Sequence, residues 1–233
     1  MSNPLLQVSE LPVFTRIETG DIEPAVKTLI SRNKQAIDDL LDDNDTFSAE
    51  NLLQPIEDLD DELARMFSPV SHLNSVRNSD ELREAYNACL PLLSEYSTWM
   101  GQHQRLFQAY QQIEQSEQAD TLNAAQRKAL DNALRDFRLA GVALPDDKKQ
   151  RYGELKKRLS ELGSKFGENV LDATNAWSKN VGADELAGLP ETALAGAKQA
   201  AEQAGVEGYL INLEFPSYYP VPVSYTHLRA HET

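Results

Sequence analysis

The residues whose types suit metal chemistry are the four histidines, two of which stand close together near the C-terminus. His227 and His231 are four positions apart and Glu232 follows them, which invites comparison with the zinc motif HExxH. That motif places glutamate directly after the first histidine, so that two ligands and a general base share one helical face. Leu228 occupies that place here, and Ala230 stands where the inverted motif HxxEH needs glutamate. The spacing therefore predicts no zinc site at these residues.

The remaining histidines and the single cysteine offer no better constellation. His72 and His103 fall on different predicted helices and have no metal ligand beside them in the sequence. Cys89 lies between apolar neighbours, which favours a buried inert thiol over a nucleophile. One cysteine also excludes an internal disulfide framework and fits a reducing compartment. We expect no catalytic, cofactor-binding or metal-ligating residue in this chain.

An acidic run between Asp38 and Glu62 raises the possibility of calcium binding, because carboxylates are the ligands that calcium prefers. An EF-hand loop that began at Asp42 would need glycine at its sixth position and glutamate at its twelfth, where Phe47 and Leu53 stand. The run is better explained as solvated helix faces. No glycine-rich phosphate loop and no GxSxG elbow occurs in the sequence.

Charge and hydropathy exclude two classes of partner. The chain has 22 basic and 37 acidic residues and a net charge of −15, whereas nucleic-acid binding needs a basic face. No stretch has the length and apolarity of a membrane span, and the N-terminus has no signal-peptide pattern. We expect a cytoplasmic protein that binds neither nucleic acid nor membrane.

Apolar residues recur at helical spacing over most of the chain, which predicts a mostly α fold of long antiparallel helices. The expected helices cover residues 24–41, 46–68 with a kink at Pro55, 79–110 with a break near Pro91 or Gly101, 121–141, and 145–177. A small strand element follows, with strands near 178–181 and 209–214 around a helix at 190–204. We divide the chain into a helical region at 1–177 and a small α/β element at 178–222 that begins a longer region.

The clearest apolar stripe belongs to the helix at 145–177. Residues at spacings of three and four form it, namely Tyr152, Leu155, Leu159, Leu162, Phe166, Val170, Ala173 and Trp177. Aromatic residues also lie at helical spacing elsewhere, and core packing explains all of them without a ligand, namely Tyr96, Trp99, Tyr110, Tyr152, Phe166 and Trp177.

The last eleven residues, 223–233 (VSYTHLRAHET), fit nothing before them. They match an in-frame translation of the transposase adapter used in short-read DNA library preparation, with a boundary codon that Pro222 satisfies. We expect this segment to be non-native and exclude it from the fold prediction. His227 and His231 would then not belong to the natural protein.

Several segments resemble the thimet oligopeptidase family of zinc metallopeptidases, and the resemblance covers residues 1–222. The segments that carry it are 67–76 (FSPVSHLNSV), 81–86 (ELREAY), 92–99 (LLSEYSTW), 131–137 (DNALRDF) and 170–174 (VLDAT). They are packing segments and contain no catalytic motif.

The resemblance implies a cytoplasmic enzyme that hydrolyses short peptides in a channel between two largely helical halves. Its HExxH helix and third zinc ligand, a downstream glutamate, would lie beyond the residues matched here. We therefore expect this chain alone to bind no zinc and to be inactive, and its partner to be the C-terminal catalytic part of the same protein. Apolar faces that pack on that part should be exposed here. The alternative is a stand-alone helical interaction module that docks through the stripe ending at Trp177.

Overall fold

The computed structural model describes residues 3–7 and 11–224, in two compact units, Met1–Leu162 and Gly163–Thr233. It confirms a mostly helical fold with one two-stranded antiparallel sheet. His227, His231, Glu232 and most of the predicted adapter segment lie outside the described residues.

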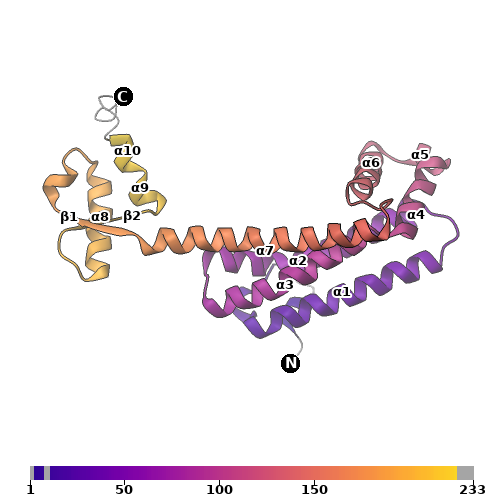
Figure 1. Cartoon of the computed structure of the whole chain (residues 1–233), viewed down its shortest axis with the longest axis horizontal. Coiled ribbons are helices and arrows are strands. Elements are labelled where there is room, and N and C mark those ends of the chain that lie inside the picture. The colour runs from indigo at the N-terminus through magenta and orange to yellow at the C-terminus, as the bar shows by residue number, and fades with distance from the viewer. Residues whose placement is uncertain (1–2, 8–10, 225–233) are drawn as a thin grey trace. The chain divides into compact units, whose positions relative to one another are not determined.

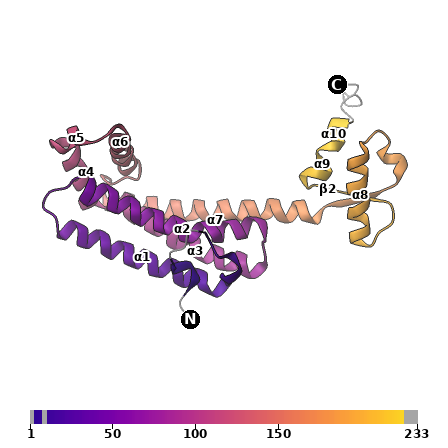
Figure 2. The ribbon, with the colours of Figure 1, turned by 180° about the vertical axis from the view of Figure 1, so that it is seen from behind.

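Three long helices form one end of the first unit. They are α1 (Thr19–Asp42), α2 (Gln54–Val76), which follows a π-helical turn η3 (Ala49–Leu53), and α3 (Asp80–Gly101). The three helices lie side by side in both views (Figure 1, Figure 2). Apolar stripes of all three meet in a buried core, which includes Ile22, Val26, Leu29, Met66, Val70, Leu82 and Cys89.

A second core lies at the other end of the first unit. Helices α4 (Gln104–Gln115), α5 (Gln118–Thr121) and α6 (Ala124–Leu139) gather there (Figure 1). Their apolar faces close over the ends of α1 and α2, burying Ile37, Leu52, Leu106, Ile113, Leu130, Leu134 and Phe137 among others. The helix expected at 121–141 is thus confirmed, and it buries Leu130, Leu134 and Phe137.

Two predictions based on proline were wrong. Pro24 was expected at the first position of its helix, but α1 begins at Thr19, where Glu18 and Asp21 form a capping box, and Pro24 lies inside it. The helix at 46–68 was expected to end before Pro69, yet α2 continues to Val76. Pro69 and Val70 are buried against the first core, and this burial offsets the hydrogen bond that proline removes.

Helix α7 (Asp146–Ala176) is confirmed as the long helix that the stripe predicts, but its packing is not. None of its residues is buried. The prediction that Phe166 and Trp177 pack in a core was wrong, since they are 71% and 44% exposed. Amphipathic spacing predicts that a face needs cover and does not identify what covers it.

The second unit contains the sheet. Strand β1 (Ser178–Val181) pairs antiparallel with β2 (Tyr209–Asn212), with Val181 opposite Tyr209. Between them lie η4 (Ala183–Leu186) and α8 (Glu191–Ala204), and after them α9 (Phe215–Tyr218) and α10 (Pro220–Ser224). Val181, Leu186 and Leu189 form a small core.

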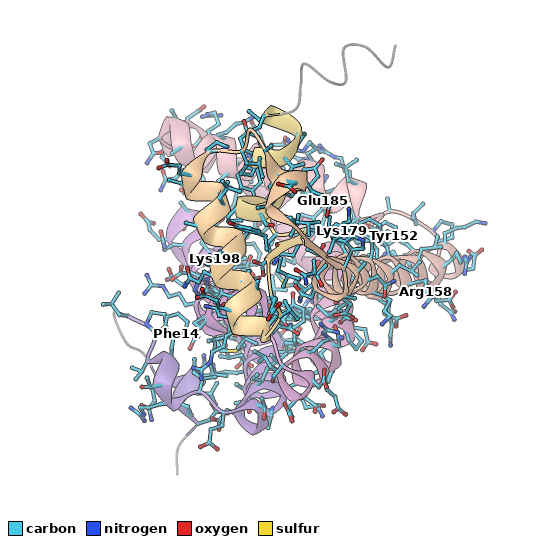
Figure 3. All side chains as sticks on the ribbon, turned by 90° about the vertical axis from the view of Figure 1, so that its left-hand side faces the viewer. Phe14, Tyr152, Arg158, Lys179, Glu185 and Lys198 are labelled. Carbon is cyan, nitrogen blue, oxygen red and sulfur yellow. The ribbon has the colours of Figure 1, made fainter. Side chains whose placement is uncertain are left out.

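Local contacts fix the sheet's ends. Lys179 and Glu185 lie close together (Figure 3), with Nζ 3.1 Å from the carboxylate. Gly208, just before β2, has a φ of 91°, and a Cβ atom there would lie 2.8 Å from the carbonyl oxygen of Val181. Only glycine fits this approach without strain.

Candidate functional site

His103 is a structural residue at the start of α4. Its Nδ1 atom accepts a hydrogen bond from the backbone N–H of Leu106 at 3.1 Å, so the imidazole caps the helix. Its ring lies edge-on to Trp99 with centroids 4.9 Å apart, and its Nε2 atom is 3.6 Å from a carboxylate oxygen of Asp38. The side chain is only 12% exposed. These contacts occupy the imidazole with capping and packing.

His72 lies on the exposed surface of α2, with its ring centroid 5.6 Å from that of Phe14. It belongs to α2, whereas His103 caps α4. The structure therefore does not bring these two histidines together as a ligand pair.

Cys89 is fully buried in the core of α1, α2 and α3, and its thiol donates to the carbonyl oxygen of Ala85 at 3.3 Å. Burial raises the pKa of this thiol to about 11, and the nearby charge of Glu23 adds to the shift. A nucleophilic cysteine needs the opposite shift, because the thiolate is the reactive form.

The acidic run is distributed along helix surfaces, and three of its carboxylates pair with arginines. The carboxylate of Asp42 pairs with Arg105, Asp61 pairs with Arg65 at 2.7 Å, and Glu62 pairs with Arg32. Each of these side chains is more than a third exposed. Ion pairs between exposed side chains are ordinary surface features, so the run is not arranged as a cation site.

Within residues 3–7 and 11–224, no group of three or more histidine, cysteine, aspartate or glutamate side chains converges as a metal site would require. The Nδ1 atom of His103 is used in the helix cap, and His72 lies on another helix. The histidine side chains that zinc prefers as ligands therefore do not fit a zinc site here. In the same residues, no helix is both long and apolar enough to cross a bilayer.

Two buried side-chain oxygens in the first unit make no hydrogen bond of good geometry. They are the side-chain carbonyl oxygen of Asn33 and the hydroxyl of Tyr96. Burial raises the pKa of the Tyr96 hydroxyl, the adjacent Asn33 side chain opposes that shift, and the charge of Asp60 adds to it. Asn33 is itself fully buried and donates to the carbonyl oxygen of Leu59 at 3.1 Å. This polar pair was not anticipated from the sequence, because neither residue belongs to a motif.

Two hollows lie in the first unit. One of about 500 Å³ is bordered by the N-terminal segment, α1 and α2, with Arg16, Glu62 and Arg65 among its lining residues. The other, of about 420 Å³, lies between α3 and the first half of α7, and Glu95, Trp99, Gln150, Glu154 and Lys157 are among the residues that line it. Neither holds a nucleophile–base pair, so neither forms a catalytic site from the described residues.

The second hollow reveals how α7 is oriented in this unit. Its polar residues Gln150, Glu154 and Lys157 face α3, and Lys157 Nζ lies 2.8 Å from the carboxylate of Glu95. Leu155 and Leu159, on successive turns of the same part of α7, are 53% and 66% exposed. Gly153 lies on this polar face, where a Cβ atom would be in ordinary van der Waals contact with the Thr98 methyl at 3.5 Å. The orientation is the reverse of an ordinary surface helix.

The comparisons with known proteins are consistent with a helical N-terminal domain. The family profile described as "Neurolysin/Thimet oligopeptidase, N-terminal domain" matches residues 26–149. Proteins named oligopeptidase A from Escherichia coli and Haemophilus influenzae are 53% and 52% identical over 222 residues, which is 95% of this chain. A protein from Arabidopsis thaliana named probable cytosolic oligopeptidase A is 31% identical over 94% of the chain.

The matches cover a much smaller share of each relative than of this chain. The matches span 33%, 32% and 32% of the relatives from E. coli, H. influenzae and A. thaliana. The chain therefore spans about a third of the length of the curated relatives that it matches.

Proposed function

Because the chain belongs to the thimet oligopeptidase family, we propose that it supplies the N-terminal helical part of a zinc-dependent oligopeptidase that hydrolyses short peptides. The observation that carries the proposal is the 53% identity over 222 residues to a protein named oligopeptidase A. An identity of that size over 95% of the chain supports a shared role for this part of the protein.

The chemical step belongs, in this proposal, to the part of the relatives beyond the matched third. The described residues do not fit a zinc site, so no step is assigned to them. In metallopeptidases of this kind, zinc polarises the scissile carbonyl and activates a water molecule. The contribution of this chain is shape: its helices form one wall of the channel that admits peptides and excludes folded proteins.

The 233-residue chain alone has no peptidase activity, because His72 and His103 are separate and His103 is used as a helix cap. A cytoplasmic location is supported by the one buried, unpaired cysteine, which is compatible with a reducing compartment.

A chimera tests the role. Residues 1–222 of this chain would be joined to the remaining two thirds of the E. coli relative, with the intact E. coli protein as matched control. We expect the chimera to hydrolyse a short fluorogenic peptide at a rate comparable to the control, and a zinc chelator to abolish the activity. A chimera that is folded by circular dichroism but inactive would contradict the proposal.

A further inference from the structure

In the first unit, α7 exposes the apolar face that its sequence period predicts to be buried. At about 100° of rotation per residue, Leu155, Leu159 and Leu162 project from one side of the helix, and Gln150 and Lys157 from the other. The polar side lines the hollow against α3, whereas the three leucines are 53%, 66% and 48% exposed. We call these three residues the α7 leucine face.

This face differs from the chain's scattered exposed apolar residues. Leu139 on α6 is 70% exposed as a single side chain at the end of its helix, which is normal for a soluble domain. The α7 leucine face instead repeats over successive turns of one helix, the pattern of a packing surface. In the second unit the same sequence period continues with Phe166, Val170 and Trp177, which are 71%, 50% and 44% exposed.

We propose that the α7 leucine face is the docking surface for the polypeptide that lies beyond the matched third in family-length relatives. The occupant is inferred from length, because the relatives from E. coli and H. influenzae contain about two thirds of their residues outside the match. A segment of that size must contact its N-terminal domain, and contiguous exposed apolar faces mark such contacts. The inference rests on family membership and is independent of the zinc chemistry.

The orientation of α7 supports an apolar occupant. The polar face is turned toward α3, where Lys157 pairs with Glu95. Along the edge of the leucine face, Arg158 pairs with Glu161 at 3.1 Å, which satisfies the adjacent charges. The leucines are left to pack against another apolar surface.

Thiol labelling tests the proposal, because the native Cys89 is buried and its pKa is raised. Leu159→Cys would be introduced into the 233-residue chain and into the chimera of residues 1–222 with the remaining two thirds of the E. coli relative. Modification would be measured by mass spectrometry on the peptide that carries position 159. Leu139→Cys is the matched control, since Leu139 is 70% exposed and lies on α6, away from the leucine face.

We expect the Leu159→Cys variant to label at least about tenfold more slowly in the chimera than in the 233-residue chain. A thiol covered by the docked polypeptide reacts only when the structure opens locally. The Leu139→Cys variant should label at similar rates in both. Equal rates for Leu159→Cys in chain and chimera would overturn the proposal. Protection that appears only as the concentration of the 233-residue chain rises would also overturn it, in favour of a second copy as the occupant.

A second measurement covers a chimera that folds poorly. The 233-residue chain would be co-expressed with a tagged polypeptide of the remaining two thirds. Co-purification should occur with the native chain and with Leu139→Asp, and be lost with Leu159→Asp. Capture that is equal for both variants would contradict the proposal. An active chimera in which the thiol of Leu159→Cys still reacts as fast as in the chain contradicts the docking surface alone. An inactive chimera in which that thiol is protected contradicts the proposed function alone.

Discussion

Nζ of Lys157 donates a hydrogen bond to Oε1 of Glu95 across 2.8 Å, and this ion pair joins the polar face of α7 to α3. The pair lies on the side of α7 opposite Leu155 and Leu159, and both of these leucines are exposed. Exposed ion pairs contribute little to stability, so the pair marks which face of α7 meets α3 and leaves the apolar stripe without cover.

Lys157→Ala should loosen the first half of α7. The hydrogen bond to Glu95 raises the pKa of Lys157, so its contribution to stability is complete below the ordinary value of 10.5 and is lost as the pH rises above it. At neutral pH we expect amide hydrogen exchange in residues 150–157 to be faster in the variant than in the native chain. Added salt should not change the exchange rate of the variant. Lys156→Ala is the control, and unchanged exchange in Lys157→Ala would contradict this account.

Tyr96→Phe should not destabilise the first unit. The hydroxyl of Tyr96 is buried beside the Asn33 side chain but makes no hydrogen bond of good geometry. Removing such a poorly satisfied group avoids a desolvation cost of about 1–3 kcal/mol. Urea unfolding should give an unchanged or higher free energy for this variant. Phe137→Ala, which opens a cavity in the other core, should lose about 3–5 kcal/mol as the reference. A clear loss of stability in Tyr96→Phe would show that its hydroxyl has a partner.

His103 should behave as a helix cap in stability measurements. Replacing it with alanine removes the acceptor for the N–H of Leu106 and should cost about 1 kcal/mol, the usual value for a lost cap. His103→Asn keeps an acceptor and should cost less. Thermal unfolding distinguishes the two variants, and equal destabilisation would argue against capping. Neither variant should reduce peptide hydrolysis by a folded chimera.

Cys89 should be unreactive in the folded chain. Burial raises the pKa of its thiol from 9.0 to about 11, so a disulfide reagent at pH 8 should modify it only after urea unfolds the protein. Because the folded pKa exceeds the unfolded one, this group stabilises the fold fully below pH 9. That contribution decreases as the pH rises from 9 to 11. Rapid modification of the native chain would place Cys89 outside the core.

The helices were predictable because their apolar periods are long and their ends carry capping residues. Ser79 stands at the start of the helix expected at 79–110 and caps α3, since its hydroxyl accepts a hydrogen bond from the N–H of Leu82 at 3.2 Å. Both strands were also located to within two residues, at 178–181 and 209–212. Proline misled the prediction at Pro24 and Pro69, because local backbone rules do not include the burial that a neighbouring helix supplies.

Packing partners were not predictable. The stripe on α7 indicates a face that needs cover, but only the structure shows that Gln150, Glu154 and Lys157 face α3 instead. The prediction of no site residue stays a prediction, since His227 and His231 lie outside the described residues.

The most direct test of the central claim is peptide hydrolysis by the purified 233-residue chain, measured beside the chimera with a short fluorogenic peptide and added zinc. The account predicts no turnover by the chain alone and chelator-sensitive turnover by the chimera. Zinc-dependent cleavage by the chain alone would contradict it.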